Sequence, residues 1–171
     1  MHRLLLGFGV LALLLLACPR DGAAQTITVR GKFQYAVKFV CGPDGGPGTG
    51  GPAFGHYSTH VNIHNPNGAI TFAKKVAIGF PGNVAGRVSG FVAETLGEDQ
   101  AETVNCGKIQ TIAGTGGGFL EGFLVIVTPK ELDVTTVYTG EVTVGSGVTT
   151  MHVNATPPRK LTLAVTAPAP D

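Results

Sequence analysis

Apolar residues recur at every second position along most of the chain, which is the pattern of strands that bury one face. In the run 32–41 one face carries Lys32, Gln34 and Lys38, and the other carries Phe33, Tyr35, Val37, Phe39 and Cys41. This parity predicts that Cys41 faces inward. The same alternation predicts strands at 56–64, 69–80, 87–96, a segment ending at Cys106, 119–127, 132–139, 141–144 and 148–154.

Clusters of glycine, proline and asparagine separate these runs and predict turns. Gly/Pro-rich loops are expected at 42–55 and 114–118, a tight turn at 65–68 and a hairpin turn at 145–147. Residues 93–96 and 108–113 are the two places where a short helical turn fits the pattern. Seven to nine short strands joined by such turns predict an all-β antiparallel sandwich, immunoglobulin-like in general architecture. A barrel has the same pattern. We favour the sandwich because a disulfide bond between two sheets commonly stabilises that architecture.

Two charged residues interrupt otherwise apolar strand faces. Lys74 lies in phase with the buried face of the strand 69–80, and a bulge or an edge position around 73–75 would explain it. Glu121 interrupts the run 119–127, which is apolar on both faces and is the best candidate for a central strand. We expect Glu121 to lie at an edge or to meet a nearby cation (Lys74, Lys75 or Arg87).

The first residues have the layout of an export signal rather than of a folded domain. A short basic start precedes an apolar run from Leu4 to Ala17, which is shorter than the ~20 residues of a membrane span. Cleavage after Ala24 would leave a soluble domain at 25–158 and an Ala/Pro-rich tail at 159–171. The alternative is a bacterial lipoprotein, because the segment ending Leu16-Ala17-Cys18 resembles a lipobox, with Cys18 as the acylated residue. A retained membrane anchor is the third alternative.

The remaining cysteines are Cys41 and Cys106, and an even number in an exported chain favours a disulfide bond. Two buried free thiols are the alternative. The formal net charge of +1 gives no electrostatic signature for nucleic acid. The chain has no tryptophan, which removes the commonest stacking platform for sugars but leaves tyrosine and phenylalanine.

Several of these segments resemble a family of uncharacterised exported bacterial proteins. The likeness spans 31–158 and is carried by 35–42, 61–66, 71–77 and 132–139. It implies an exported single β-domain and no activity, cofactor or site residue. In strand order and turns the chain also resembles the small β-sandwich of sensory-rhodopsin transducer proteins.

Three histidines recur every fourth residue at His56, His60 and His64. On a helix this spacing would gather imidazoles for a metal ion, but on a strand consecutive side chains lie ~13 Å apart. We therefore expect a solvated polar face, with a metal site as the alternative, and His152 has the parity to sit on an outer face as well. The segment 62–67 is expected to serve the turn, with a polar recognition loop as the alternative.

Sequence motifs of catalysis are missing. None of the serines (Ser58, Ser89 and Ser146) lies in a nucleophile elbow, and the glycine loops match no phosphate-binding pattern. Carboxylates crowd the turn 94–102, where a solvated patch is expected and a Ca²⁺ site is the alternative.

We therefore expect a non-catalytic exported β-sandwich without a cofactor, acting as an interaction or structural module at the cell surface or in the periplasm, with a protein or surface partner. The alternative is a module that binds a metal ion or a small polar ligand through the His56 to His64 strand. An enzyme is the third hypothesis.

Overall fold

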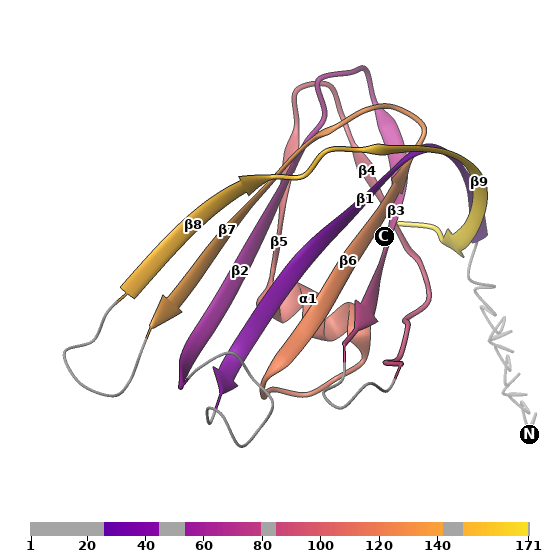
Figure 1. Cartoon of the computed structure of the whole chain (residues 1–171). Coiled ribbons are helices and arrows are strands. Elements are labelled where there is room, and N and C mark those ends of the chain that lie inside the picture. Colours follow the sequence, from indigo (N-terminus) through magenta and orange to yellow (C-terminus); the bar gives the residue numbers. More distant parts are fainter. Residues whose placement is uncertain (1–25, 45–53, 80–84, 142–148, 171) are drawn as a thin grey trace, which may run out of the picture.

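The computed structural model of the chain describes residues 26–44, 54–79, 85–141 and 149–170 (Figure 1). This part folds into antiparallel strands and one short helix, which confirms the predicted all-β class. The elements are β1 (Thr26–Asp44), β2 (Gly55–His64), β3 (Ile70–Ile78), β4 (Val92–Leu96), β5 (Ala101–Asn105), α1 (Cys106–Ala113), β6 (Leu120–Thr128), β7 (Asp133–Glu141), β8 (Thr149–Ala155) and β9 (Arg159–Pro168).

All nine strands belong to one large sheet that is not closed, in the order β4-β3-β6-β1-β2-β7-β8, with β5 added to β2 and β9 to β1. β1 meets β2 only at its C-terminal end, from Gly42 opposite Tyr57 to Asp44 opposite Gly55. Farther along β2, β5 takes the place of β1 on the same edge. The sheet therefore divides into two layers, β9-β1-β6-β3-β4 and β5-β2-β7-β8, which are the two sheets expected of the sandwich.

The core lies between these two layers. The predicted alternation in β1 is confirmed, because Tyr35, Val37, Phe39 and Cys41 are all fully buried. They pack against residues of the other layer, including Val61, Ile63 and Val104. β6 lies between β1 and β3, as expected of a central strand.

The helix α1 closes the core between β5 and β3, behind β1 and β6 in the view of Figure 1. Its only fully buried residue is Ile109, which joins the main core cluster. The side chain of Asn105 caps its N-terminus by accepting a hydrogen bond from the backbone N–H of Lys108 (3.0 Å). Gly114 ends it in the left-handed conformation (φ 63°), which glycine adopts without steric cost. The predicted helical turn at 108–113 is thus confirmed, and the helix begins two residues earlier.

The expected tail at 159–171 is wrong over most of its length. Residues 159–168 form β9, which pairs with the N-terminal half of β1 from Thr26 opposite Pro168 to Gln34 opposite Arg159. Val165 packs with Val29 and Val127 in a second, smaller core cluster, and Ala167 is buried as well. The Ala/Pro composition predicts an unpaired C-terminal tail. The segment forms a strand instead, because its alternate residues cover apolar side chains of the neighbouring strands. For the same reason β1 begins at Thr26, earlier than predicted.

Two further expectations need correction. The bulge at 73–75 does not exist, because β3 keeps an unbroken register with β4 and with β6 through Lys74. The strand expected at 87–96 is regular only over β4, and Val88 makes an isolated bridge to Ala77. The export segment with Cys18, and the hairpin turn at 145–147, lie outside the described residues.

Candidate functional site

The three histidines of β2 lie along one strand on the outer face of its layer. His56 and His60 are exposed and His64 is half-buried, whereas Thr59, Val61 and Ile63, at the alternate positions, are buried. Successive histidines are therefore ~13 Å apart, too far for one metal ion to bind two of them. Within the described parts of the chain, no group of three metal-ligating side chains comes together. The strand does not assemble the three imidazoles.

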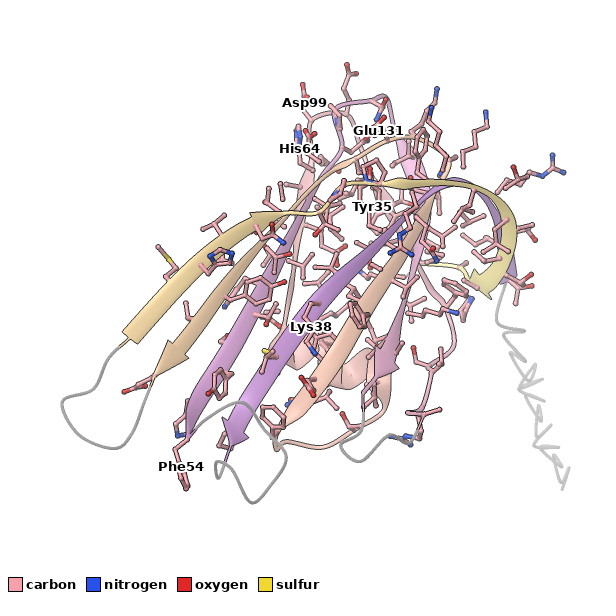
Figure 2. All side chains as sticks on the ribbon, in the orientation of Figure 1. Tyr35, Lys38, Phe54, His64, Asp99 and Glu131 are labelled. Carbon is pink, nitrogen blue, oxygen red and sulfur yellow. A yellow bond between two sulfur atoms is a disulfide. The ribbon has the colours of Figure 1, made fainter. Side chains whose placement is uncertain are left out.

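His64 instead has two carboxylate neighbours, Asp133 at the start of β7 and Asp99 in the turn before β5. His64 and Asp99 lie at the same end of the molecule (Figure 2). The Nδ1 of His64 lies 3.0 Å from Asp133 Oδ2, and its Nε2 lies 3.8 Å from Asp99 Oδ1. Both carboxylates are largely exposed. Exposed pairs of this kind contribute little to stability, so this arrangement is a surface contact.

The turn that follows β2 is held by Asn65, whose side chain is fully buried. Its Nδ2 donates to the carbonyls of Gly68 (3.1 Å), Leu96 (3.2 Å) and Gly97 (2.8 Å). Its Oδ1 accepts from the backbone N–H of Asn67 at 3.0 Å. Asn65 therefore holds two turns together. These contacts support the interpretation that the segment 62–67 serves the turn, rather than its alternative, a polar recognition loop.

The expected disulfide bond between Cys41 and Cys106 is present. It links β1 to the start of α1 at the point where β1 and β5 diverge along β2. Thr59 of β2 fills the divergence, because its hydroxyl donates to the carbonyl of Val40 (2.8 Å) and accepts from the N–H of Val40 (3.0 Å). Such a bond indicates an oxidising environment, as exported proteins experience.

The two charged strand residues have different partners from those expected. Glu121 accepts a hydrogen bond from Lys38 of the neighbouring strand at 2.7 Å, and not from Lys74, Lys75 or Arg87. Lys74 points into the interior and is fully buried. Its ammonium contacts Glu102 of β5 and Glu94 of β4, the latter at 3.1 Å. The carboxylates of the 94–102 turn are thus not all a solvated patch, since two of them reach this buried cation.

A cleft in the described surface lies where the inner face of β2, β7 and β8 extends past the edge of β1. It has a volume of about 340 Å³, which is at the lower end of the range for small-molecule sites. Its lining is mainly apolar and contains no lysine, arginine or carboxylate: Val40, Tyr57, Ser58, Tyr138, Thr139, Gly140, Met151 and His152.

Strand register explains why three rings gather in this cleft. Tyr138 of β7 lies opposite Thr59 of β2 and opposite His152 of β8, so these side chains share the inner face. The Tyr138 and His152 rings stack with centroids 6.3 Å apart and planes inclined by 25°. Tyr57 lies two positions before Thr59 on the same face, and its ring meets Phe119 edge-on at 6.2 Å. His152 therefore belongs to the inner face, opposite to that of His56, His60 and His64.

Tyr138 is fixed as a neutral wall of the cleft. Its hydroxyl donates a hydrogen bond to the carbonyl of Lys38 on β1 at 2.8 Å, so the side chain reaches from β7 across β2 to β1. Burial raises the pKa of Tyr138 above its ordinary value. A neutral, anchored ring of this kind suits binding by contact and stacking rather than proton transfer.

The sequence alone did not point to this cleft. In the sequence pattern, Tyr57 and Tyr138 fall at the alternate positions expected to face the core. β7 and β8 follow the same alternation as the other strands, so nothing in the pattern marks a cleft there. The cleft exists because β1 leaves the edge of β2 after three residue pairs and uncovers the inner face beyond it. That divergence is a property of how the two layers twist apart, and no local motif encodes it.

No described helix is long and apolar enough to cross a membrane. Comparisons of the sequence with protein-family models and with curated proteins find no match. Among solved structures, the chain is similar to the crystal structure of Thermotoga maritima 1070, with a TM-score of 0.44 and 8% sequence identity over 74% of this chain and 93% of that one. A likeness this distant assigns no family and carries no argument about function.

Proposed function

We propose that the protein is a non-catalytic exported binding module whose binding site is the aromatic cleft between β1 and the β2-β7-β8 layer. The observation that carries this proposal is the meeting of Tyr57, Tyr138 and His152 around an uncharged cavity of about 340 Å³. Pockets that combine apolar walls with a few fixed polar groups are the usual form of a small-molecule site.

The lining suits a neutral ligand with one flat apolar face. The stacked Tyr138 and His152 rings offer a platform of that shape, and the cleft has no formal charge to match an ionic group. Ser58, Thr139 and Gly140 also line the cleft, whose surface includes polar atoms that can meet polar substituents of a ligand. A saccharide ring has both properties, so we propose a neutral saccharide as the ligand class.

Binding can be tested by titrating the mature protein with a panel of neutral mono- and oligosaccharides while recording amide NMR shifts. We expect shifts confined to the strands that carry Tyr57, Tyr138 and His152. Tyr138→Ala should abolish them, whereas Tyr138→Phe should retain most of the affinity, because the ring remains. Phe123→Ala is the matched control, since Phe123 is an exposed aromatic residue on β6 outside the cleft. Shifts that survive both Tyr138→Ala and His152→Ala would refute the site.

We also propose that the module works in the periplasm or outside the cell. The apolar leader and the disulfide bond both support export. The mature form is either soluble from Gln25 or attached to lipid through Cys18. The intact mass of protein purified from an exporting bacterial host distinguishes these two forms, because acylation of Cys18 adds the mass of its fatty acids to a longer chain.

A further inference from the structure

The strand β8 ends the sheet with an open edge. Among the described residues it pairs only with β7, and it is the terminal strand in the sheet order (Figure 1). The backbone N–H and C=O groups that point away from β7 are therefore available to another strand. Exposed edges of this kind pair readily unless the sequence blocks them.

The other terminal strands contain features that block pairing, and β8 does not. β9 begins with Arg159 and Lys160 and ends with Pro168. β4 and β5 are only five residues long, and they carry Glu94 and Glu102. The sequence of β8 contains no charged residue, proline or glycine. Short length, charges and proline are the usual protections of an edge, so β8 is the unprotected one.

The edge also presents apolar side chains to solvent. Met151 is 71% exposed and Val153 is 57% exposed. Both alternate with His152 along β8; Val153 lies opposite Val137 of β7, and Met151 also borders the cleft. A strand added beside β8 would cover part of this apolar surface.

The sequence of β8 allows two antiparallel copies of this strand to pair with each other. His152 is the middle residue of the seven in β8, so two antiparallel copies centred on it pair along their whole length. In that register Met151 of each copy lies opposite Val153 of the other, which places apolar beside apolar. β8 contains no lysine, arginine, aspartate or glutamate, so no permanent charge opposes the approach of a second copy.

We propose that the protein self-associates through β8 into a two-fold symmetric dimer, in which one sheet runs continuously from β7 of one copy to β7 of the other. The second copy is the occupant that this self-complementary pattern specifies, since a two-fold interface requires the same patch to match itself. An interface built on one seven-residue strand per copy is small, so the dimer is of the weak class. The interface strand shares Met151 and His152 with the cleft, but Val153 does not line it, so a substitution at Val153 tests the dimer without changing the cleft lining.

Sedimentation velocity of the mature protein from micromolar to millimolar concentration tests the dimer. We expect reversible dimer formation in the wild type and at least a tenfold weaker association in Val153→Lys. Val88→Lys is the matched control, because Val88 is 58% exposed and lies against β3 in the other layer, away from β8. A wild type that stays monomeric throughout, or a Val153→Lys variant that dimerises like the wild type, overturns the proposal.

Cross-linking tests the register without relying on a charged substitution. Met151→Cys and Val153→Cys variants are prepared separately and then mixed under mild oxidation; Cys41 and Cys106 are already bridged to each other. The proposed register brings position 151 of one variant opposite position 153 of the other, so the mixture should form the disulfide-linked dimer faster than either variant alone. Equal rates in all three samples overturn the register centred on His152.

Discussion

The ammonium of Lys74 on β3 is fully buried and forms an ion pair with Glu102 on β5. These two strands belong to different layers, and β4 lies between them in the chain without pairing with β5. Glu94 of β4 supplies a second carboxylate, and the Phe72 ring lies 5.5 Å from the ammonium. The contact therefore holds the two layers together along the side where the sheet is not closed.

We expect Lys74→Met to destabilise the protein by about 3–5 kcal/mol, because it leaves the mostly buried carboxylate of Glu102 and the partly exposed one of Glu94 without a cation. The second oxygen of Glu102 is already buried without a hydrogen-bond partner among the described residues, so this carboxylate has nothing else to compensate it. The double variant Lys74→Met/Glu102→Leu should recover much of the loss, since a well-packed apolar pair can replace a buried ion pair. Urea unfolding measures both changes.

The neighbouring Lys75→Met is the control for this experiment. Lys75 lies on the opposite face of β3 and rests over the Phe91 ring at 4.6 Å. A contact of this kind near the surface is worth about 0.5–1 kcal/mol, so the control should lose little. Equal losses for the two lysine variants would contradict a special role for the buried one.

Removal of the bridge by Cys41→Ala/Cys106→Ala should cost about 4 kcal/mol of stability, mainly because the unfolded chain regains the freedom of a long loop. The two cysteines are 65 residues apart in sequence. The bridge also sits where β1 and β5 diverge, so its loss should loosen the contacts of Thr59 with Val40. Chemical unfolding of the double variant, compared with wild type with and without reductant, measures the effect. A loss below about 1 kcal/mol in both comparisons would contradict this account.

Tyr35 should make the protein less stable at alkaline pH. Its hydroxyl donates to the carbonyl of Leu132 (2.7 Å) and accepts from the N–H of the same residue (2.8 Å). Burial raises the pKa of Tyr35 above 10.0, and the hydrogen bond to Leu132 offsets only part of that effect. Above pH 10 the unfolded chain loses this proton before the folded protein does, so the free energy of unfolding falls as pH rises from there toward the folded-state pKa.

In Tyr35→Phe, that alkaline loss should become shallower. The variant should also lose about 2 kcal/mol at neutral pH, because the backbone groups of Leu132 are left buried without their partner. Denaturant unfolding at neutral pH and at several values above pH 10 separates these two effects. An alkaline slope unchanged from wild type would show that other groups cause it.

The local pattern of the chain contains most of the strand assignments. The alternation from Phe33 to Cys41 predicted both the buried face of β1 and the inward direction of Cys41. The bridge to Cys106 was predicted from the even number of cysteines that remain after the export segment. The same period placed His56, His60 and His64 on one strand. These predictions succeeded because a strand that buries one face must alternate, whatever its neighbours are.

The local sequence pattern did not predict interactions between residues that lie far apart in the chain. Lys74 looked like a defect because its carboxylates come from two later strands, and Glu121 was assigned to the wrong cation because strand neighbours depend on topology. Residues 159–168 looked like a tail because nothing near them indicates that β1 offers a free edge. The aromatic cleft was invisible for the same reason, since its three rings come from β2, β7 and β8.

The sequence by itself determined that the chain is an all-β protein with a set of amphipathic strands and one cysteine pair, because these features depend on period, composition and turn chemistry alone. Only the tertiary structure decided which strands are neighbours, where β1 and β5 part along β2, and hence which inner-face residues are covered and which line the cleft. The physical reason is that burial of a strand face is a local requirement, whereas the partner that buries it is set by the twist and order of the whole sheet.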